Sequence, residues 1–296
     1  MKFLVFSENL GSLSQMITYL REKGEVIGVG LEKSSSEASN FGASKLYSIK
    51  GDILSDSAAK LLEELFKKEG VDNIFLSSSI LGREAAGILS VALGAGIVPE
   101  INEISFDGSK AKTKRFYLGG KTVLEEESQA KIFTVSPGIS DAIKSDKKSE
   151  IFSIEAPQSK IKILSRQSKK AEGSNIENAK IIVCIGRGLG KKEGIESVKP
   201  LVEAVHGEIA GSRPVCLDYQ WLGEDRQIGL SGKKVRPAIY VGVGVSGQIQ
   251  HIAGMRGSKI VIAINKDKTA PIFEEADYGL VGDLYQIIPK IVEKLS

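Results

Sequence analysis

The 296-residue sequence contains few of the residues that build metal centres, disulfide frameworks and nucleic-acid surfaces. It has two cysteines and two histidines, with no cysteine pair at metal-ligand spacing, so a metal site is not expected. Cys184 and Cys216 each lie in an apolar run, which predicts buried free thiols rather than a disulfide. Aromatic residues make up only 6% of the chain, too few for base-stacking platforms.

Long apolar runs and a large charge of one sign are also missing. No apolar run approaches the length that crosses a bilayer, and Met1-Lys2-Phe3-Leu4 is typical of a strand rather than of a signal peptide. The 40 basic and 37 acidic residues leave a formal net charge of +3, which does not indicate a nucleic-acid groove. We therefore expect a cytoplasmic chain with no transmembrane segment and no nucleic-acid partner.

The first half of the chain alternates between strand and helix patterns, which is typical of a parallel sheet with helices on both faces. Strands are predicted over residues 2–6, 25–31, 45–49 and 72–76, and helices over 13–23 (with Ser12 as N-cap), 35–43, 56–68 and 80–93. After Gly96 the pattern changes, and the strands predicted over 98–104, 115–118, 132–135, 149–156 and 160–164 have no helices between them. These later strands suggest hairpins added to the parallel core.

A polar, apolar-poor segment, residues 165–177, is the best linker in the chain. It separates an N-terminal domain, 1–168, from a C-terminal domain, 176–296. Behind it, strands are predicted over residues 179–185, 208–210, 238–241, 260–264 and 277–281, and helices over 197–205 and 284–295. We predict an α/β chain of two domains, each an open and mostly parallel sheet flanked by helices.

The stretch from Ala238 to Asp267 is a strand–turn–helix–strand unit suited to holding a phosphate. Its turn has the spacing Gly242-x-Gly244-x-x-Gly247, with Ser246 as the expected N-cap of the helix. Glycines there let backbone N–H groups approach a ligand, and the spacing matches the dinucleotide fingerprint of NAD-binding proteins. An ordinary α/β turn that uses glycines for packing is the alternative.

Ligands of open parallel sheets bind at the carboxyl ends of the strands. In the C-terminal domain these ends carry polar and charged residues that we expect to converge on one crevice. They are Arg187, Ser212, Arg213, the segment from Ser246 to His251, Asn265 and Asp283.

At this point the sequence resembles the alpha subunit of electron-transfer flavoprotein. The resemblance is nearly continuous over residues 180–296, through GRGLG (186–190), GSRPV (211–215), DRQIGLSGKKVRP (225–237), YVGVGVSGQIQHIAGM (240–255) and IVIAINKDKTAPIFEEADYGLVGDL (260–284). The N-terminal half is similar more loosely, mainly through SSSILGREAAGILSVALGAGIV (77–98) and FYLGGK (116–121).

This resemblance implies FAD in a Rossmann-like C-terminal domain and a heterodimer with a beta subunit. It implies an electron carrier rather than an enzyme, with no catalytic residue of its own. Electrons would come from flavoprotein dehydrogenases, such as the acyl-CoA dehydrogenases of fatty acid oxidation, and pass to a quinone reductase or a similar acceptor.

The resemblance also implies roles for particular residues. Arg213 would lie against the flavin ring, Ser231 near its N5 edge, and His251 near its pyrimidine carbonyl, where the charge of the histidine would add to the helix dipole. Arg187 would reach the pyrophosphate. The remaining residues of the implied FAD site are Ser212, Ile228, Gly229, Leu230, Ser246, Gly247, Gln248, Ile249, Gln250, Asn265, Asp283 and Leu284.

Leu230 departs from the family, which usually has a glutamine at this position. Leucine offers no side-chain hydrogen bond to flavin. This change leaves open a binding scaffold that has lost its flavin. An NAD-dependent oxidoreductase that uses the GVGVSG turn is the other alternative.

Overall fold

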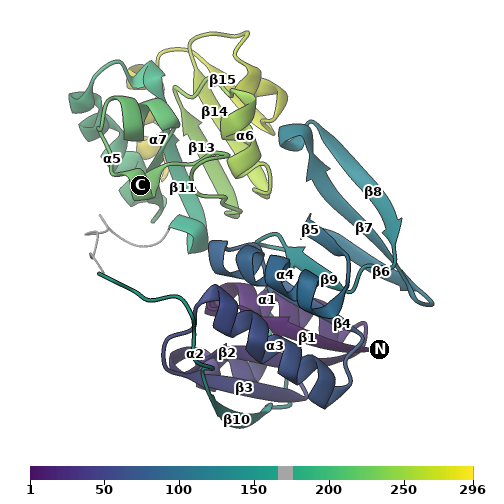
Figure 1. The fold of residues 1–296 in the computed structure, drawn as a ribbon. Helices are drawn as coiled ribbons and strands as arrows, with labels where there is room; N and C mark the ends of the chain where they lie inside the picture. Colours follow the sequence, from purple (N-terminus) through teal and green to yellow (C-terminus); the bar gives the residue numbers. More distant parts are fainter. Residues whose placement is uncertain (166–175, 296) are drawn as a thin grey trace. The chain divides into compact units, whose positions relative to one another are not determined.

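The computed structural model of the chain describes residues 1–165 and 176–295, which fall into two compact units (Figure 1). Unit 1 comprises Met1–Tyr117 and Thr122–Arg166, and unit 2 comprises Leu118–Lys121 and Gln167–Ser296. The predicted linker lies mostly outside the described residues. The predicted domain limits, 1–168 and 176–296, stay a prediction.

Unit 1 is built on a seven-stranded sheet in the order β10-β3-β2-β1-β4-β9-β5, in which every neighbouring pair is parallel. Its strands are β1 (Lys2–Phe6), β2 (Glu25–Leu31), β3 (Lys45–Lys50), β4 (Asn73–Ser77), β5 (Ile97–Ile101), β9 (Ile132–Val135) and β10 (Glu150–Glu155), and its helices are α1 (Leu10–Arg21), α2 (Glu32–Ala38), α3 (Ser55–Glu69) and α4 (Ile80–Leu93). The predicted alternation of strand and helix is confirmed.

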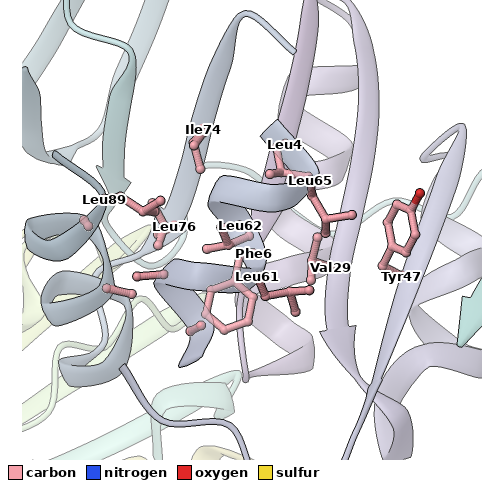
Figure 2. Packing of buried hydrophobic residues seen from close by; sticks show 14 of the residues in the cluster. Leu4, Phe6, Val29, Tyr47, Leu61, Leu62, Leu65, Ile74, Leu76 and Leu89 are labelled. Carbon is pink, nitrogen blue, oxygen red and sulfur yellow. The ribbon is translucent and has the colours of Figure 1, made fainter. Parts of the chain in front are cut away.

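Side chains of the central strands alternate between two hydrophobic cores, because successive residues of a strand point to opposite faces. Leu4 and Phe6 pack with α3 and α4 on one face, whereas Phe3 and Val5 pack with α1 and α2 on the other. Figure 2 shows Leu61, Leu62 and Leu65 of α3 beside Leu4, Phe6 and Val29 of the sheet. Helices therefore cover both faces of the unit 1 sheet.

A carboxylate is held at the rim of the first core. The Tyr47 hydroxyl donates to Glu69 Oε1 at 2.6 Å, and Lys45 Nζ donates to Glu69 Oε2 at 2.9 Å. These two hydrogen bonds, in that order of size, lower the pKa of Glu69 to about 2. Glu69 is therefore ionised at neutral pH, and its hydrogen bonds connect α3 to β3.

The antiparallel part of unit 1 differs from the prediction. Residues 97–101 and 132–135 belong to the parallel sheet as β5 and β9, and the hairpins are formed by β6 (Glu103–Asp107), β7 (Lys110–Tyr117) and β8 (Thr122–Ser128). No strand was predicted over 122–128, because its three consecutive glutamates do not suggest one. They pair with basic side chains of β7, in the pairs Lys114–Glu125, Arg115–Glu126 and Lys110–Glu127.

Two local predictions in unit 1 are wrong. Residues 160–164 form no strand, and the side chains of Ile161, Ile163 and Leu164 are exposed, so they gain nothing from pairing. Helix α1 is capped by Asn9, whose side chain accepts the backbone N–H of Ser12 at 3.2 Å, and not by Ser12 itself.

Unit 2 contains a five-stranded parallel sheet in the order β12-β11-β13-β14-β15. Its strands are β11 (Ile181–Ile185), β12 (Glu208–Gly211), β13 (Ile239–Val243), β14 (Ile260–Asn265) and β15 (Tyr278–Val281), and its helices are α5 (Ile195–Ala204), α6 (Ile249–Met255) and α7 (Leu284–Leu295). Met255 of α6 packs in the core on one face of the sheet, whereas α5 and α7 share the core on the other. The predicted fold class, two open α/β sheets flanked by helices, is confirmed.

Candidate functional site

The carboxyl ends of the unit 2 strands carry the residues singled out from the sequence. Because the five strands are parallel, their carboxyl ends lie along one edge of the sheet. In strand order this edge bears Arg213 after β12, Arg187 after β11, Ser246 after β13, Asn265 at the end of β14 and Asp283 after β15. The fold therefore places these strand ends along one edge of the sheet, and their convergence on one crevice stays a prediction.

The glycine turns after β11 and β13 interlock. Gly186 N–H donates to the Val243 carbonyl at 2.8 Å, and Gly188 N–H donates to the Gly244 carbonyl at 2.9 Å. A Cβ built at Gly186 would lie 2.2 Å from the Gly244 carbonyl oxygen, and one at Gly188 would lie 2.8 Å from Gly244 Cα. Gly244 itself has φ +64°, in the left-handed region. Each turn therefore requires the absence of side chains in the other.

The third fingerprint glycine is packed in the same manner. Gly247 has φ +80°, and a Cβ there would lie 2.2 Å from the backbone nitrogen of Ile272. The adjacent Ser246 carbonyl accepts the Ile272 N–H at 3.1 Å. At Gly186, Gly188, Gly244 and Gly247 the missing Cβ thus makes room for the protein's own backbone, as the packing interpretation of the turn expects.

Ser246 is not the N-cap of the following helix, contrary to the prediction. Helix α6 begins at Ile249 with Gln248 in the cap position, and no side chain caps it. The reason is the tie between Ser246 and Ile272, together with the turn at Gly247, which keeps residues 246–247 out of the helix. His251 is still in the first turn, since its N–H donates to the Gln248 carbonyl at 2.8 Å.

The segment from Ile228 to Ser231 lies directly against α6. The Leu230 N–H donates to the Gln250 carbonyl at 2.7 Å. A Cβ at Gly254 would lie 2.4 Å from the Gly229 nitrogen, so only glycine in α6 allows this approach. Ile228 is buried in the core, whereas the Leu230 side chain is 54% exposed. This contact brings the predicted residues 228–231 beside Gln250 and His251.

The polar side chains of this region differ in how firmly they are held. The Ser231 hydroxyl accepts a hydrogen bond from Gln227 Nε2 at 3.1 Å. Ser212 is buried, and its N–H donates to the Ile185 carbonyl at 3.0 Å. The Arg213 side chain is 65% exposed and meets Asp218 Oδ1 only at 3.7 Å. Arg187 is also exposed, at the start of the 3-10 turn after β11.

His251 is the most constrained of the predicted site residues. It is only 7% exposed, and its Nε2 lies 2.6 Å from the Tyr240 hydroxyl and 3.8 Å from Cys184 Sγ. Its Nδ1 is buried and has no hydrogen-bond partner among the described residues. One ring nitrogen is thus fixed by the core, and the other has no hydrogen-bond partner within residues 1–165 and 176–295.

The charge expected for His251 is not supported. Burial lowers the pKa of His251 to about 4, and the neighbouring Ile228 carbonyl acts in the opposite direction but more weakly. The imidazole is therefore neutral at physiological pH in this structure. It can add a hydrogen-bond donor to the first turn of α6, but not a full positive charge.

The remaining predicted residues line the far end of the edge. Asn265 Nδ2 donates to the Val245 carbonyl at 2.8 Å, and the Asp283 carboxylate accepts the Tyr285 N–H at 2.9 Å, as an N-cap of α7 does. The Leu284 side chain is buried in the core, so only its backbone faces the edge. Ser246, Gln248 and Gln250 are exposed, and Ile249 is half-buried.

Two residues that shape the site were not predicted to do so. Tyr240 was treated only as part of a β-prone run, and Cys184 only as a buried thiol, yet both contact the ring of His251. A signal was available, because Tyr240 is the only hydroxyl-bearing residue between Ala238 and Val245. Both cysteines are free and buried, as predicted.

Within residues 1–165 and 176–295, no group of three or more His, Cys, Asp or Glu side chains could hold a metal ion. Over the same described residues, none of the helices is both long and apolar enough to cross a membrane.

Comparison with known proteins identifies both halves of the chain. Residues 19–159 match the electron transfer flavoprotein domain, and residues 175–256 match the electron transfer flavoprotein FAD-binding domain. Proteins named FixB from Salmonella typhimurium and Escherichia coli are each 30% identical to it over 304 aligned positions, which cover 99% of this chain and 97% of each relative.

Proposed function

The chain belongs to the alpha-subunit family of electron transfer flavoproteins, and from this premise we propose that it is an electron carrier holding FAD at the carboxyl edge of the unit 2 sheet. FAD is the cofactor of the domain family that residues 175–256 match. When bound, FAD supplies a ring that accepts and releases electrons. The residues of this chain would bind the ring, orient it and set the energy of its reduced form.

The buried and unpartnered Nδ1 of His251 is the observation that carries this proposal. A buried polar atom without a partner costs roughly 1–3 kcal/mol, so its persistence favours a ligand that satisfies it. The ring is fixed at its other nitrogen, so Nδ1 is available to a carbonyl of the flavin. The close packing of Gly229 on α6 brings Leu230 and Ser231 beside the turn of α6 that carries His251.

The two exposed arginines fit the charges of the cofactor. The Arg213 side chain is exposed and pairs with Asp218 at 3.7 Å, and exposed pairs of this kind contribute about 0–1 kcal/mol, so its guanidinium can turn to a ligand at small cost. Beside the ring it would favour negative charge on reduced flavin, and Arg187 after β11 would favour the pyrophosphate. Asn265 and Asp283 would serve the ribose and adenine side.

An electron carrier needs no acid–base pair, and the site supports that interpretation. The pKa of His251, lowered by burial to about 4, makes it a fixed hydrogen-bond donor rather than a group that exchanges protons near neutral pH. The competing NAD-dependent oxidoreductase rests on the GVGVSG turn, in which the space beside Gly244 and Gly247 is occupied by the protein's own backbone. The proposal includes a beta subunit as the partner in a heterodimer, flavoprotein dehydrogenases such as acyl-CoA dehydrogenases as donors, and a quinone reductase or similar acceptor. The cytoplasmic location stays a prediction.

The first experiment is the visible absorption spectrum of the chain, purified alone and with its candidate beta subunit. We expect an oxidised-flavin spectrum and FAD, rather than FMN, released on denaturation. Replacing Arg187 with alanine should weaken FAD binding, whereas the matched change Lys33→Ala, at an exposed position of α2 in unit 1, should not. A preparation that stays colourless after addition of FAD and partner would contradict the proposal.

A further inference from the structure

Three buried polar side chains of unit 2 meet around one ring nitrogen of His251. Cys184 is on β11, Tyr240 on the neighbouring strand β13, and His251 in the first turn of α6. Cys184 and Tyr240 are fully buried and His251 is 7% exposed. The Tyr240 hydroxyl lies 2.6 Å from His251 Nε2, and Cys184 Sγ lies 3.8 Å from the same nitrogen.

The direction of the hydrogen bond between Tyr240 and His251 follows from chemistry and distance. A separation of 2.6 Å is short for an N–H donor, which prefers about 2.9–3.0 Å, but ordinary for an O–H donor. Sulfur is a weak acceptor, so the phenol proton is better placed on the imidazole nitrogen than on Cys184. Tyr240 therefore donates to Nε2, and its remaining lone pairs are available to the Cys184 S–H.

This direction determines where the histidine proton lies. In a neutral imidazole one nitrogen is a donor and the other an acceptor, so an Nε2 that accepts requires the proton to be on Nδ1. The segment 228–231 packs on the same first turn of α6 that carries His251, because the Leu230 N–H donates to the Gln250 carbonyl.

We propose that Tyr240, seated on Cys184, is a positioning residue that keeps His251 in the Nδ1–H tautomer and so presents a neutral hydrogen-bond donor to the flavin. This inference rests on the proposed function for the identity of the acceptor, but the tautomer itself does not depend on FAD. With the other tautomer, the Nδ1 lone pair would face the flavin carbonyl and repel it. The hydrogen bond from Nδ1–H becomes stronger as negative charge collects on that carbonyl in reduced flavin.

The chain offers a clean test, because it has only two histidines. Labelling with ¹⁵N-histidine gives two sets of ring signals, and the variant His206→Gln assigns them. In the wild-type protein we expect a neutral His251 with a protonated Nδ1 and an unprotonated Nε2 at pH 7. A wild-type spectrum with the proton on Nε2 would overturn the proposal whether or not any variant folds.

Three variants then separate positioning from packing. Tyr240→Phe removes the donor with little change of volume, and we expect the His251 signals to move toward the Nε2–H tautomer. We also expect about a tenfold loss in the preference for reduced over oxidised FAD, which is about 59 mV for one electron. Cys184→Ser keeps a donor beneath Tyr240 and should preserve the wild-type tautomer and potential. Tyr47→Phe, which deletes a buried hydroxyl in unit 1, is the matched control and should change neither.

The outcomes distinguish this inference from the proposed function. If the Tyr240→Phe protein retains the wild-type tautomer and potential, the positioning role is wrong even though FAD binds. If the wild-type protein has the Nδ1–H tautomer but never binds FAD, the proposed function fails and the tautomer assignment holds. If FAD binds without shifting the His251 Nδ1 signal, the donor does not face the flavin and the inference is wrong at that step.

Discussion

Gly254 offers the sharpest test of how the candidate site is built. A Cβ at this position of α6 would lie 2.4 Å from the Gly229 nitrogen and 2.6 Å from Gly229 Cα, whereas ordinary contacts begin at 3.4 Å. In Gly254→Ala the segment that carries Leu230 and Ser231 must therefore move by about 1 Å. Overpacking of this kind costs about 1–3 kcal/mol, and the helix propensity of alanine returns at most about 1 kcal/mol.

We expect Gly254→Ala to lower the free energy of unfolding by about 1–2 kcal/mol and to weaken FAD binding. Urea unfolding followed by the fluorescence of Trp221, the only tryptophan, reports on unit 2, and FAD titration reports on the site. The matched control is Gly87→Ala in α4, where no atom lies within 4 Å of the new Cβ. That substitution should raise the stability of unit 1 by about 0.5–1 kcal/mol, measured by circular dichroism. A Gly254→Ala protein with wild-type stability and FAD affinity would refute the close packing of α6 on Gly229.

Three further predictions follow from single residues. The pKa of Glu69 is lowered from its ordinary value of 4.5 to about 2, so its ionised form stabilises the fold fully above pH 4.5 and less as the pH falls toward 2. We expect the free energy of unfolding to fall by up to about 3 kcal/mol over this range. Urea unfolding midpoints measured against pH should show this loss in the wild-type protein and not in Glu69→Gln. Arg213→Ala should lower the one-electron potential of bound FAD by about 60–130 mV, which corresponds to one charge-assisted hydrogen bond. The control Asp218→Asn should leave the potential near the wild-type value. Equal potentials in the wild-type protein and both variants would exclude contact of Arg213 with the flavin ring. Burial raises the pKa of Cys216 to about 12 and raises that of Cys184 as well, so neither thiol should react with an alkylating reagent at pH 8 until the protein unfolds, and rapid labelling of the native protein would contradict this.

The sequence was sufficient for the parallel sheets and for the row of strand ends, because both depend on patterns local to the chain. Apolar runs and amphipathic segments alternate, and parallel strands align their carboxyl ends wherever the alternation holds. Arg187, Arg213 and Asn265 could therefore be assigned to one edge before any coordinates. The fingerprint glycines were found in the same way, although their packing partners were not.

The errors arise where distant segments decide local structure. The start of α6 is set by the bond between Ser246 and Ile272, and a cap signal near Ser246 cannot reveal it. The glutamates of strand β8 pair with basic side chains of β7, which is a property of strand pairing and not of the segment alone. The neutrality of His251 depends on burial beside Tyr240, and no spacing in the sequence reports burial of a polar group.

The last strand of the unit 1 sheet affects the order in which the chain can fold during synthesis. Strand β10 pairs with β3 at one edge of the sheet, and just beyond it Asp56 accepts hydrogen bonds from Ser159 Oγ at 2.6 Å and from the Lys160 N–H at 2.7 Å. A nascent chain that has emerged only as far as β9 therefore exposes β3 as an open edge, which is prone to pair with other chains. Strand β10 and its contact with Asp56 can complete unit 1 only once Lys160 has left the ribosome, shortly before residues 176–295 begin to emerge.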